Sequence, residues 1–213
     1  RSKEGHEKIL SAFANEEADI LVGTQMIVKG HDFPNVTFVG VLAADLSLYS
    51  DDYRASEKTF QLLLQAVGRA GRGNKKGEAV IQTYHPEHYS ILAAAAQDYE
   101  AFYQAEIGYR LLMDYPPAAF MTAIRGSCKN EELLKQAMEY CRKYIEKIYK
   151  KEDLILVGPA PEAVVKVQDY YKMVLYMRHE NREILVKLKD ALEKYIAVNR
   201  GFQDIYIQFD FNV

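Results

Sequence analysis

Apolar and polar positions along the first half of the chain follow a pattern typical of strands separated by helices. Ile9, Leu10 and Phe13 share one face of an expected opening helix. Three β-branched runs follow, each bounded by turn residues: "ILVGT" from Ile20, "VTFVGVL" from Val36 and "EAVIQTY" from Glu78. Strands that alternate with helices predict a parallel sheet covered by helices, which is the α/β class.

An amphipathic helix is expected between the second and third of these runs. Its core stripe repeats at helical spacing and consists of Phe60, Leu63, Leu64 and Val67. Ser56 is expected to cap its N-terminus. On the same helix, Gln65, Arg69 and Arg72 lie roughly opposite the core stripe, at about 100° per residue. The pattern therefore predicts that the two arginines point outward together.

A second helical pattern spans residues 86–113. It ends at "DYPP", where Pro116 and Pro117 prevent the helix from continuing. We therefore predict a first domain over residues 1–114, which includes this linking helix, and a second domain over residues 115–213.

The second domain shows patterns in the order strand, helix, strand, strand, helix, strand. The strands are "FMTAIRGS", "LILVG", "KMVLYM" and "IYIQFDF", and the helices run from Leu133 to Ile148 and from Ile184 to Ile196. This order predicts a smaller α+β domain of the split β-α-β, ferredoxin-like kind. The last strand places alternate residues on one face, which we expect to cover the helix pair: Ile205, Ile207, Phe209 and Phe211.

Length and composition exclude the fibrous and disordered classes. The chain has 213 residues, of which 49% are hydrophobic and 27% are charged, and its net charge is -3. This mildly acidic balance does not favour nucleic-acid binding, so such a site would have to be a local patch. Cys128 and Cys141 have neither zinc-site nor disulfide-scaffold spacing. We expect both to be buried, in a protein of a reducing compartment.

The terminal and apolar segments bear on localisation. No apolar run is long enough to cross a bilayer, and the N-terminus lacks a basic region followed by an apolar one. We therefore expect a cytoplasmic protein without membrane contact. The chain begins at Arg1 rather than at methionine, directly on a helical pattern, which suggests a piece of a longer protein.

The stretch "QAVGRAGRG", from Gln65 to Gly73, places two arginines among very small residues. Gly71 and Gly73 are expected to end the helix, and the small residues around the arginines leave a notch. A guanidinium fork grips phosphate oxygens and can stabilise charge that develops on a transferring phosphoryl group. The alternative is a solvated helix end, at which the arginines complement the helix dipole.

The stretch "GTQMIVKGHDFPNV" follows the first predicted strand, and ligands bind at the carboxyl ends of parallel strands. Gly23 and Thr24 can offer backbone amides and a hydroxyl to a phosphate. Gly30 permits a tight turn, and Asp32 can accept hydrogen bonds from a sugar hydroxyl. The alternative is a simple connection in which Asp32 is a cap or turn residue.

These two stretches occur in the order and spacing of a known family. "GTQMIVKGHDFPNV" is similar to motif V and "QAVGRAGR" to motif VI of the superfamily-two helicases. Between them, "ADLSLYSDDYRASEKTFQLL" resembles the primosomal replication-restart helicases, the PriA or primosomal protein N′ family. The resemblance continues through "YEAFYQAEIGYRLLMDYPP" and "VGPAPEAV", so it covers nearly the whole chain. It implies a second RecA-like lobe followed by the family's C-terminal domain.

The resemblance implies roles at an ATP site. Arg72 would be the arginine finger that reaches ATP bound mainly by another lobe. Arg69 would contact the γ-phosphate, and Gln65 would help to order the hydrolysis site. Gly30 and Asp32 would belong to the nucleotide-binding part, with Asp32 sensing the nucleotide. ATP with Mg²⁺ is thus the implied cofactor of the complete enzyme.

The resemblance also implies contacts with DNA. Gly23, Thr24 and Gln25 would touch the phosphates of the tracked strand. In the second domain, Tyr171 and Lys172 keep an aromatic and basic character that could stack on bases and grip phosphate. This region has fewer arginines than the family pattern. The alternative is that the tyrosines line a strand pair with their hydroxyls at the rim.

Two motifs that the family needs for ATP hydrolysis are missing from the sequence. The chain contains neither G-x-x-x-x-G-K-[ST], which cradles phosphates, nor a D-E-x-H box. In the family both lie in an upstream lobe, and a zinc-binding cysteine insertion also lies upstream, so we expect this chain to be inactive alone. His31, His85 and His88 lack the spacing of metal ligands, and we expect no metal site here.

The function implied by the resemblance is that of an ATP-dependent 3′ to 5′ DNA helicase. It would recognise stalled or abandoned replication forks and initiate primosome assembly for replication restart. Its expected partners are forked and single-stranded DNA, single-stranded-DNA-binding protein and other primosome proteins, and we expect a monomer. One alternative is a non-catalytic platform for DNA and partner proteins. Another is a translocase that remodels protein–DNA complexes without strand separation.

Overall fold

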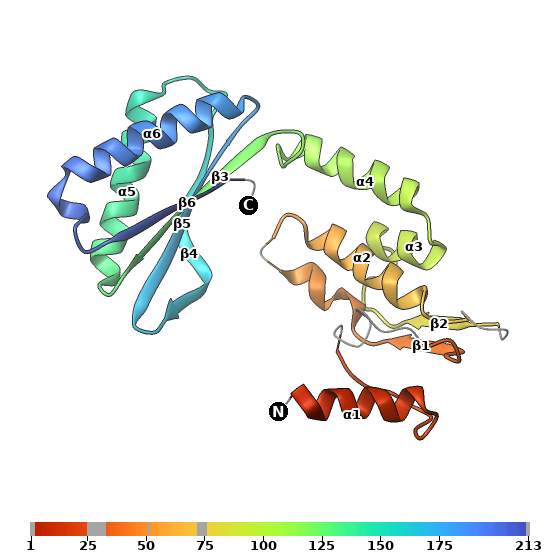
Figure 1. Cartoon of the computed structure of the whole chain (residues 1–213). Coiled ribbons are helices and arrows are strands. Elements are labelled where there is room, and N and C mark those ends of the chain that lie inside the picture. The colour runs from red at the N-terminus through yellow and green to blue at the C-terminus, as the bar shows by residue number, and fades with distance from the viewer. Residues whose placement is uncertain (1–2, 25–32, 51, 72–75, 212–213) are drawn as a thin grey trace. The chain divides into compact units, whose positions relative to one another are not determined.

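The computed structural model describes residues 3–24, 33–50, 52–71 and 76–211. The chain forms two compact units, Arg1–Glu106 and Ile107–Val213. Over the described residues the structure is mixed α/β, with a two-stranded parallel sheet in the first unit and a four-stranded antiparallel sheet in the second (Figure 1). The units divide within helix α4 (Tyr99–Leu112), and the domain boundary after residue 114 stays a prediction.

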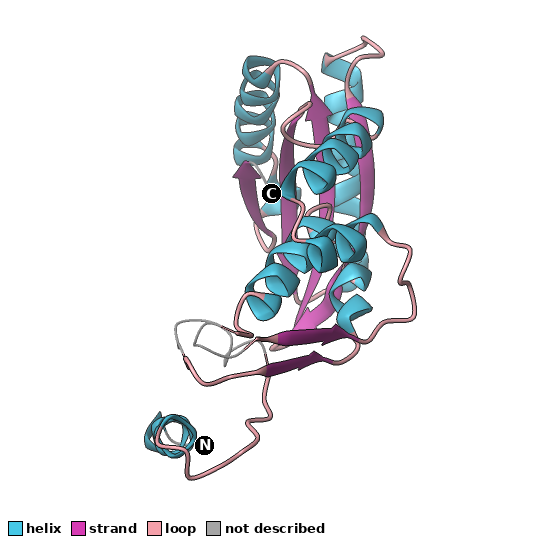
Figure 2. Cartoon of the chain, turned by 90° about the vertical axis from the view of Figure 1, so that its right-hand side faces the viewer, coloured by secondary structure: helices cyan, strands magenta, loops and turns pink. Residues whose placement is uncertain are grey.

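The first unit packs one helix, α2 (Ala55–Val67), on a pair of short parallel strands. Its elements are α1 (Lys3–Ala14), β1 (Phe38–Val41), the 3-10 helix η2 (Ala44–Tyr49), α2, β2 (Glu78–Ile81), α3 (Tyr89–Ala96) and the first part of α4. The register pairs Phe38 with Glu78 and Val41 with Ile81, and Figure 2 shows the two strands side by side. The parallel pairing predicted for the second and third apolar runs is confirmed.

The core of the first unit lies between α2 and the helices that follow β2. Phe60 and Leu63 of the predicted stripe are buried on α2. The ring of Phe60 stacks on that of Phe102 with 4.2 Å between the centroids, and Ile91 and Ala94 of α3 belong to the same cluster. The helical spacing in the sequence therefore identified the buried face of α2 correctly.

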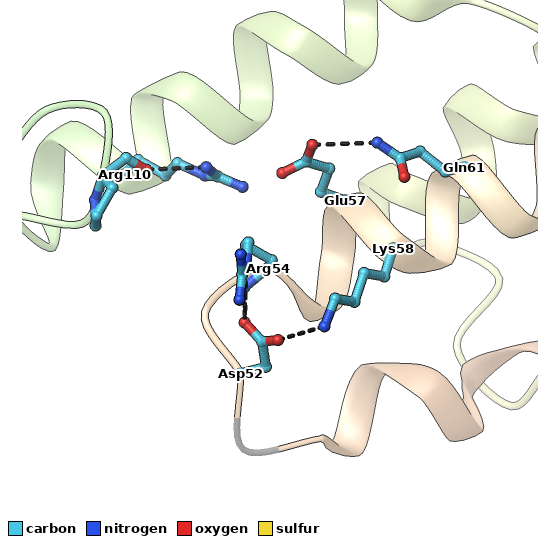
Figure 3. A network of polar contacts seen from close by, with 7 residues as sticks. Asp52, Arg54, Glu57, Lys58, Gln61 and Arg110 are labelled. Atoms are coloured by element: carbon cyan, nitrogen blue, oxygen red, sulfur yellow. Dashed lines mark hydrogen bonds and ion pairs between the residues drawn. The ribbon is translucent and has the colours of Figure 1, made fainter. Parts of the chain in front are cut away.

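The start of α2 differs from its prediction. Ser56 lies inside the helix, and the N-cap residue is Arg54, whose side chain makes no capping hydrogen bond. The side chain of Asp52 interacts with the start of the helix instead. Its carboxylate accepts a hydrogen bond from the Arg54 amide at 2.9 Å and forms ion pairs with the side chains of Arg54 and Lys58 (Figure 3). The predicted Ser56 cap is wrong because this carboxylate already interacts with the positive end of the helix dipole.

The first apolar run does not form the strand predicted for it. Residues 20–24 are neither strand nor helix, and the side chains of Ile20 and Val22 are exposed. A strand is stable only when its N–H and C=O groups pair with a neighbour, and no strand among the described residues pairs with these. A β-branched composition alone therefore did not decide the local structure.

The helix predicted over residues 86–113 is interrupted. α3 ends at Ala96, because Gln97 adopts the left-handed conformation with a φ of 56°. The carboxylate of Asp98 then accepts a hydrogen bond from the Ala101 amide at 2.9 Å at the start of α4. The sequence signal for this break was the aspartate, a residue type that favours the start of helices.

The second unit is a four-stranded antiparallel sheet with two helices on one face. Its elements are the end of α4, β3 (Phe120–Cys128), α5 (Glu131–Ile148), β4 (Ile155–Val167), β5 (Tyr170–His179), α6 (Arg182–Val198), η3 (Arg200–Phe202) and β6 (Tyr206–Phe211). The strand order is β4-β5-β3-β6, with each neighbouring pair antiparallel. Figure 1 shows α5 and α6 on the same side of the sheet. The order of strands and helices predicted for this half is confirmed.

The core of the second unit lies between the sheet and its two helices. Fully buried side chains from both layers are Ile124, Leu134, Met138, Ile145, Leu175, Met177, Leu185 and Leu192. Ile205 is buried in the same cluster, and Ile207 and Phe209 pack against it, so the inward face predicted for the last strand is confirmed at these three positions. Phe211, the fourth, is half-buried, and its ring faces the guanidinium of Arg182. Cys128 and Cys141 are buried as predicted, and burial raises the pKa of the Cys141 thiol to about 12.

The ion pairs of Asp52 lead to a prediction on stability. Burial raises the pKa of Asp52, but hydrogen bonds from Lys58 and Arg54 outweigh burial and lower this pKa from 3.8 to about 2. We expect Asp52→Asn to lower the free energy of unfolding of the first unit by about 0.5–1 kcal/mol near neutral pH, because partly exposed ion pairs contribute little. Urea denaturation of the chain measures this.

The same substitution should lose its effect in acid. Because the pKa of Asp52 is lower in the folded state, the carboxylate stabilises the fold above a pH of about 4, and this contribution is lost as the pH falls through about 2. Asp204→Asn, at an exposed aspartate of the second unit, is the matched control. A penalty for Asp52→Asn that stays constant down to the lowest pH would contradict this account.

Candidate functional site

The turn after α2 carries the first of the two arginines. α2 ends at Val67, and Gly68 is its C-cap residue. Arg69 was predicted to lie on this helix, but it lies beyond the helix end. The amide of Arg69 instead donates to the carbonyl of Ala66 at 3.0 Å, which is the tighter spacing of a 3-10 turn. Gln65 is exposed on the last turn of α2, and Arg69 is half-buried. We call residues 68–71 the arginine turn.

The arginine turn is attached to the start of the sheet. Gly71 has a φ of 74°, a left-handed conformation that favours glycine, and its amide donates to the carbonyl of Val36 at 2.9 Å. The next residue, Thr37, accepts a hydrogen bond from the amide of Glu78 at 2.8 Å, where β2 begins. Adjacent residues at the entry to β1 therefore hold both the end of this turn and the start of β2.

The stretch similar to motif V is only partly described. Gly23 and Thr24 are exposed and lie outside any helix or strand. At its other end, the ring of Phe33 meets that of Phe13 edge-on, with 5.0 Å between the centroids, and the amide of Val36 donates to the carbonyl of Phe33 at 3.3 Å. Val36 is thus the point at which this stretch meets the arginine turn.

Four predicted site residues lie outside the described residues, namely Gln25, Gly30, Asp32 and Arg72, and so do His31 and Gly73. The roles expected of them stay predictions. Of the first-unit residues predicted to bind phosphate or DNA, those described are Gly23, Thr24, Gln65 and Arg69. Among these four, Gln65 lies on the last turn of α2 and Arg69 lies in the turn that follows it.

A buried carboxylate near the carboxyl ends of β1 and β2 was not predicted from the sequence. Asp45 is only 3% exposed, and its carboxylate accepts a hydrogen bond from the amide of Tyr84 at 3.3 Å. Burial acts to raise the pKa of Asp45, but hydrogen bonds from its own amide, from Tyr84 and from Thr83 outweigh burial and lower it. The signal that could have found it is its position just after a strand of a parallel sheet.

Two further contacts join the segment that follows β1 to the segment that follows β2. The Ala43 amide donates to the side-chain oxygen of Gln82 at 2.9 Å, and Ala43 has a φ of 49°, which is uncommon for a residue with a Cβ. The hydroxyl of Tyr49 and Nε2 of His85 lie 2.7 Å apart. Both His85 and His88 lie in the segment between β2 and α3, where His85 bonds to Tyr49 and Nδ1 of His88 accepts from the Ser90 amide at the start of α3.

In the second unit, Tyr171 and Lys172 do not converge on one ligand. Successive residues of a strand point to opposite faces. The ring of Tyr171 packs against the core beneath α5 and α6, with the ammonium group of Lys166 4.8 Å from its centroid. Lys172 therefore points to the other face of the sheet. The pair predicted to contact DNA is divided between the two faces.

The face away from the helices carries a charge cluster that was not predicted. Arg125 in β3 forms ion pairs with Glu162 of β4 at 2.7 Å and with Asp210 of β6 at 2.9 Å. Burial acts to lower the pKa of Arg125, but its hydrogen bonds with these two carboxylates outweigh burial and raise it. This arginine joins three strands of the sheet rather than presenting an unpaired cation.

The described residues contain no group of three or more histidine, cysteine, aspartate or glutamate side chains that could hold a metal ion. No helix among them is long and apolar enough to span a bilayer.

Two domain families match this chain. Residues 1–74 match the helicase conserved C-terminal domain, and residues 112–212 match the primosomal protein N C-terminal domain. Among solved structures, the designed protein Foldit4 matches with a TM-score of 0.36 and 10% identity over 45% of this chain and 97% of its own. That likeness is too weak to carry an argument.

Similar proteins are replication restart proteins. PriA of Bacillus subtilis is 44% identical over 195 residues, which cover 91% of this chain and 24% of that protein. PriA of Synechocystis is 38% identical, covering 84% of this chain and 21% of its own length, and PriA of Haemophilus influenzae is 36% identical, covering 84% and 24%. The chain thus spans about a quarter of the length of these relatives. The matches extend over both units, and the chain belongs to the PriA family of replication restart proteins.

Proposed function

We propose that this chain provides the second lobe and the C-terminal domain of an ATP-dependent DNA helicase with 3′ to 5′ polarity. The complete protein would recognise stalled or abandoned replication forks and initiate primosome assembly. The observation that carries the proposal is the arginine turn, which presents Arg69 one turn beyond the exposed Gln65 and is bonded to the start of β1. Membership in the PriA family supports it.

The arginine turn suits a nucleotide that is bound mainly by another lobe. Ala70 and Gly71 beside Arg69 carry no bulky side chain, and a guanidinium makes strong, charge-assisted hydrogen bonds with phosphate oxygens. Arg69 would contact the γ-phosphate, Arg72 would be the arginine finger, and Gln65 would help to order the hydrolysis site. ATP with Mg²⁺ supplies the phosphoryl group and a neutralising cation, and the sequence lacks the motifs that cradle them.

The stretch similar to motif V would connect DNA and nucleotide. Gly23 and Thr24 are exposed, which suits contact with DNA phosphates, and Gln25 would extend this contact. Gly30 and Asp32, further along the same stretch, would belong to the nucleotide-binding part. The end of this stretch at Val36 is bonded to the arginine turn, and this bond supports a shared role.

We assign the two halves a finer fold as part of this proposal. Residues 1–114 would form a RecA-like lobe with its linking helix, which the parallel pairing of β1 and β2 supports. Residues 115–213 would form a ferredoxin-like domain. There, β5 lies between β3 and β4 and is antiparallel to both, so β3 and β4 run parallel as two strands of a split β-α-β unit.

The proposal includes partners and location. Forked and single-stranded DNA would be the substrates, and single-stranded-DNA-binding protein and other primosome proteins would bind the complete enzyme. It would act as a monomer in the cytoplasm. Zinc would belong to the cysteine-rich segment that lies upstream of this region in the family.

A second candidate function applies to this chain by itself. The sequence contains no phosphate-cradling motif, which favours a non-catalytic platform for DNA or partner proteins when the chain is alone. Titration of the isolated chain with forked DNA and with single-stranded-DNA-binding protein tests this function. If the isolated chain binds neither, the platform function is wrong for it.

The first prediction from this proposal concerns the arginines. In the complete protein, Arg72→Ala should lower fork-stimulated ATP turnover about a hundredfold while ATP still binds, because the arginine stabilises charge that develops in the transition state. Arg72→Lys should be nearly as damaging, since an ammonium group lacks the guanidinium fork. Arg200→Ala, at an exposed arginine of η3, is the control. Unchanged turnover in Arg72→Ala would refute the ATPase role.

The second prediction separates the two candidate DNA contacts of β5. Lys172→Ala should weaken fork binding and reduce the salt dependence of the binding constant by about one unit of slope, because one phosphate contact is lost. Tyr171→Ala should instead lower the free energy of unfolding by about 1–3 kcal/mol, because its ring packs on the core. Fork titrations at several salt concentrations, together with thermal unfolding, measure both. Equal effects of the two substitutions on binding would contradict this division.

A further inference from the structure

Backbone hydrogen bonds hold two described segments at the entry to β1. One segment ends at Gly71, and the other runs from Lys76 to Glu78, the first residue of β2. Gly71 bonds to Val36 at 2.9 Å, and Glu78 bonds to Thr37 at 2.8 Å. The two segments are therefore both held at the entry to β1, and they lie close to one another there.

Gly77 is the residue at which these two segments touch. A Cβ atom built on Gly77 would collide with the amide nitrogen and the Cα of Gly71 and with the carbonyl carbon of Ala70. All three atoms belong to the backbone, which cannot turn aside as the end of a flexible side chain can. Any side chain at position 77 must therefore push the arginine turn away from the segment before β2.

Such a displacement would act on the bond that anchors the turn. Gly71 provides both the atoms that face Gly77 and the amide that bonds to Val36. Arg69 lies two residues before Gly71 in the same turn, and its amide is bonded within that turn to Ala66. A shift of Gly71 therefore moves the guanidinium of Arg69 relative to the start of β1.

We propose that Gly77 is a positioning residue for Arg69: the absence of its side chain lets the segment before β2 pack against Ala70 and Gly71, and this packing fixes the position of the arginine turn relative to the entry of β1. This proposal rests on the proposed ATPase function. Gly77 contacts neither nucleotide nor DNA in this account. It acts through the arginine turn, and the stretch similar to motif V shares the same anchor through Val36.

The test uses the complete protein and its fork-stimulated ATP hydrolysis. Gly77→Ala should lower kcat about tenfold or more, because a displacement near 1 Å of a catalytic group costs rates of this order. The KM for ATP and the affinity for forked DNA should change less than about threefold, since other residues supply most of that binding. Gly108→Ala in α4, where a new Cβ meets nothing within 4 Å, is the matched control and should keep kcat unchanged.

A double-mutant cycle separates positioning from general destabilisation. If Gly77 acts through Arg69, Gly77→Ala should cost little further activity once Arg69→Ala is present. Additive losses in the cycle, or parallel losses of kcat, ATP binding and DNA binding, would overturn the proposal. If Arg72→Ala alone has no effect, the ATPase function is wrong. If Arg72→Ala is damaging and Gly77→Ala is not, only the positioning role is wrong.

If Gly77→Ala fails to fold, a pair of variants at Gly71 tests whether the geometry of the arginine turn controls turnover. Gly71 has a left-handed backbone, which asparagine adopts more readily than a β-branched residue does. Gly71→Asn should therefore keep several times more kcat than Gly71→Val. Equal activity of these two variants would show that the geometry of the arginine turn does not control turnover, and the proposal would fail.

Discussion

The hydrogen bonds at the entry to β1 are the constraint on which the candidate site of the first unit depends. Val36 and Thr37 hold the end of the arginine turn and the start of β2 through backbone atoms alone. Only small residues allow segments to approach this closely, which gives the glycines at positions 71 and 77 a structural reason. The buried stripe of α2 then sets the direction from which the chain enters the turn.

Charge is placed differently in the two units. In the first, Arg69 follows the C-terminus of α2, where the helix dipole favours a cation, and it adjoins small residues. In the second, Arg125 is paired with two carboxylates on the face of the sheet away from the helices. The first arrangement suits an anionic ligand, and the second suits cohesion of the sheet. Residue type alone does not separate these roles, because the partners come from distant strands.

Local patterns predicted the elements whose hydrophobic face is long and regular. The apolar stripe of α2 packs in the core of the first unit, and alternate apolar residues of β6 pack against the core of the second, as predicted. Start and stop signals were less informative. Ser56 was the predicted cap, but the side chain of Asp52 interacts with the start of α2 instead. Gln97, with its left-handed backbone, ends a helix that the sequence pattern had predicted to continue. Several acceptable caps occur close together in the sequence, and only the packing of the surrounding segments selects one of them.

The sequence by itself determined the family motifs, the order of elements in the second unit and the residues able to bind phosphate, because these depend on residue type and spacing. The tertiary structure decided which of these residues lie together. It joined Val36 to Gly71, paired Arg125 with carboxylates of two other strands, and buried Asp45 near the ends of two strands. These results follow from pairing between segments far apart in the chain, and no local pattern encodes the register of such pairing.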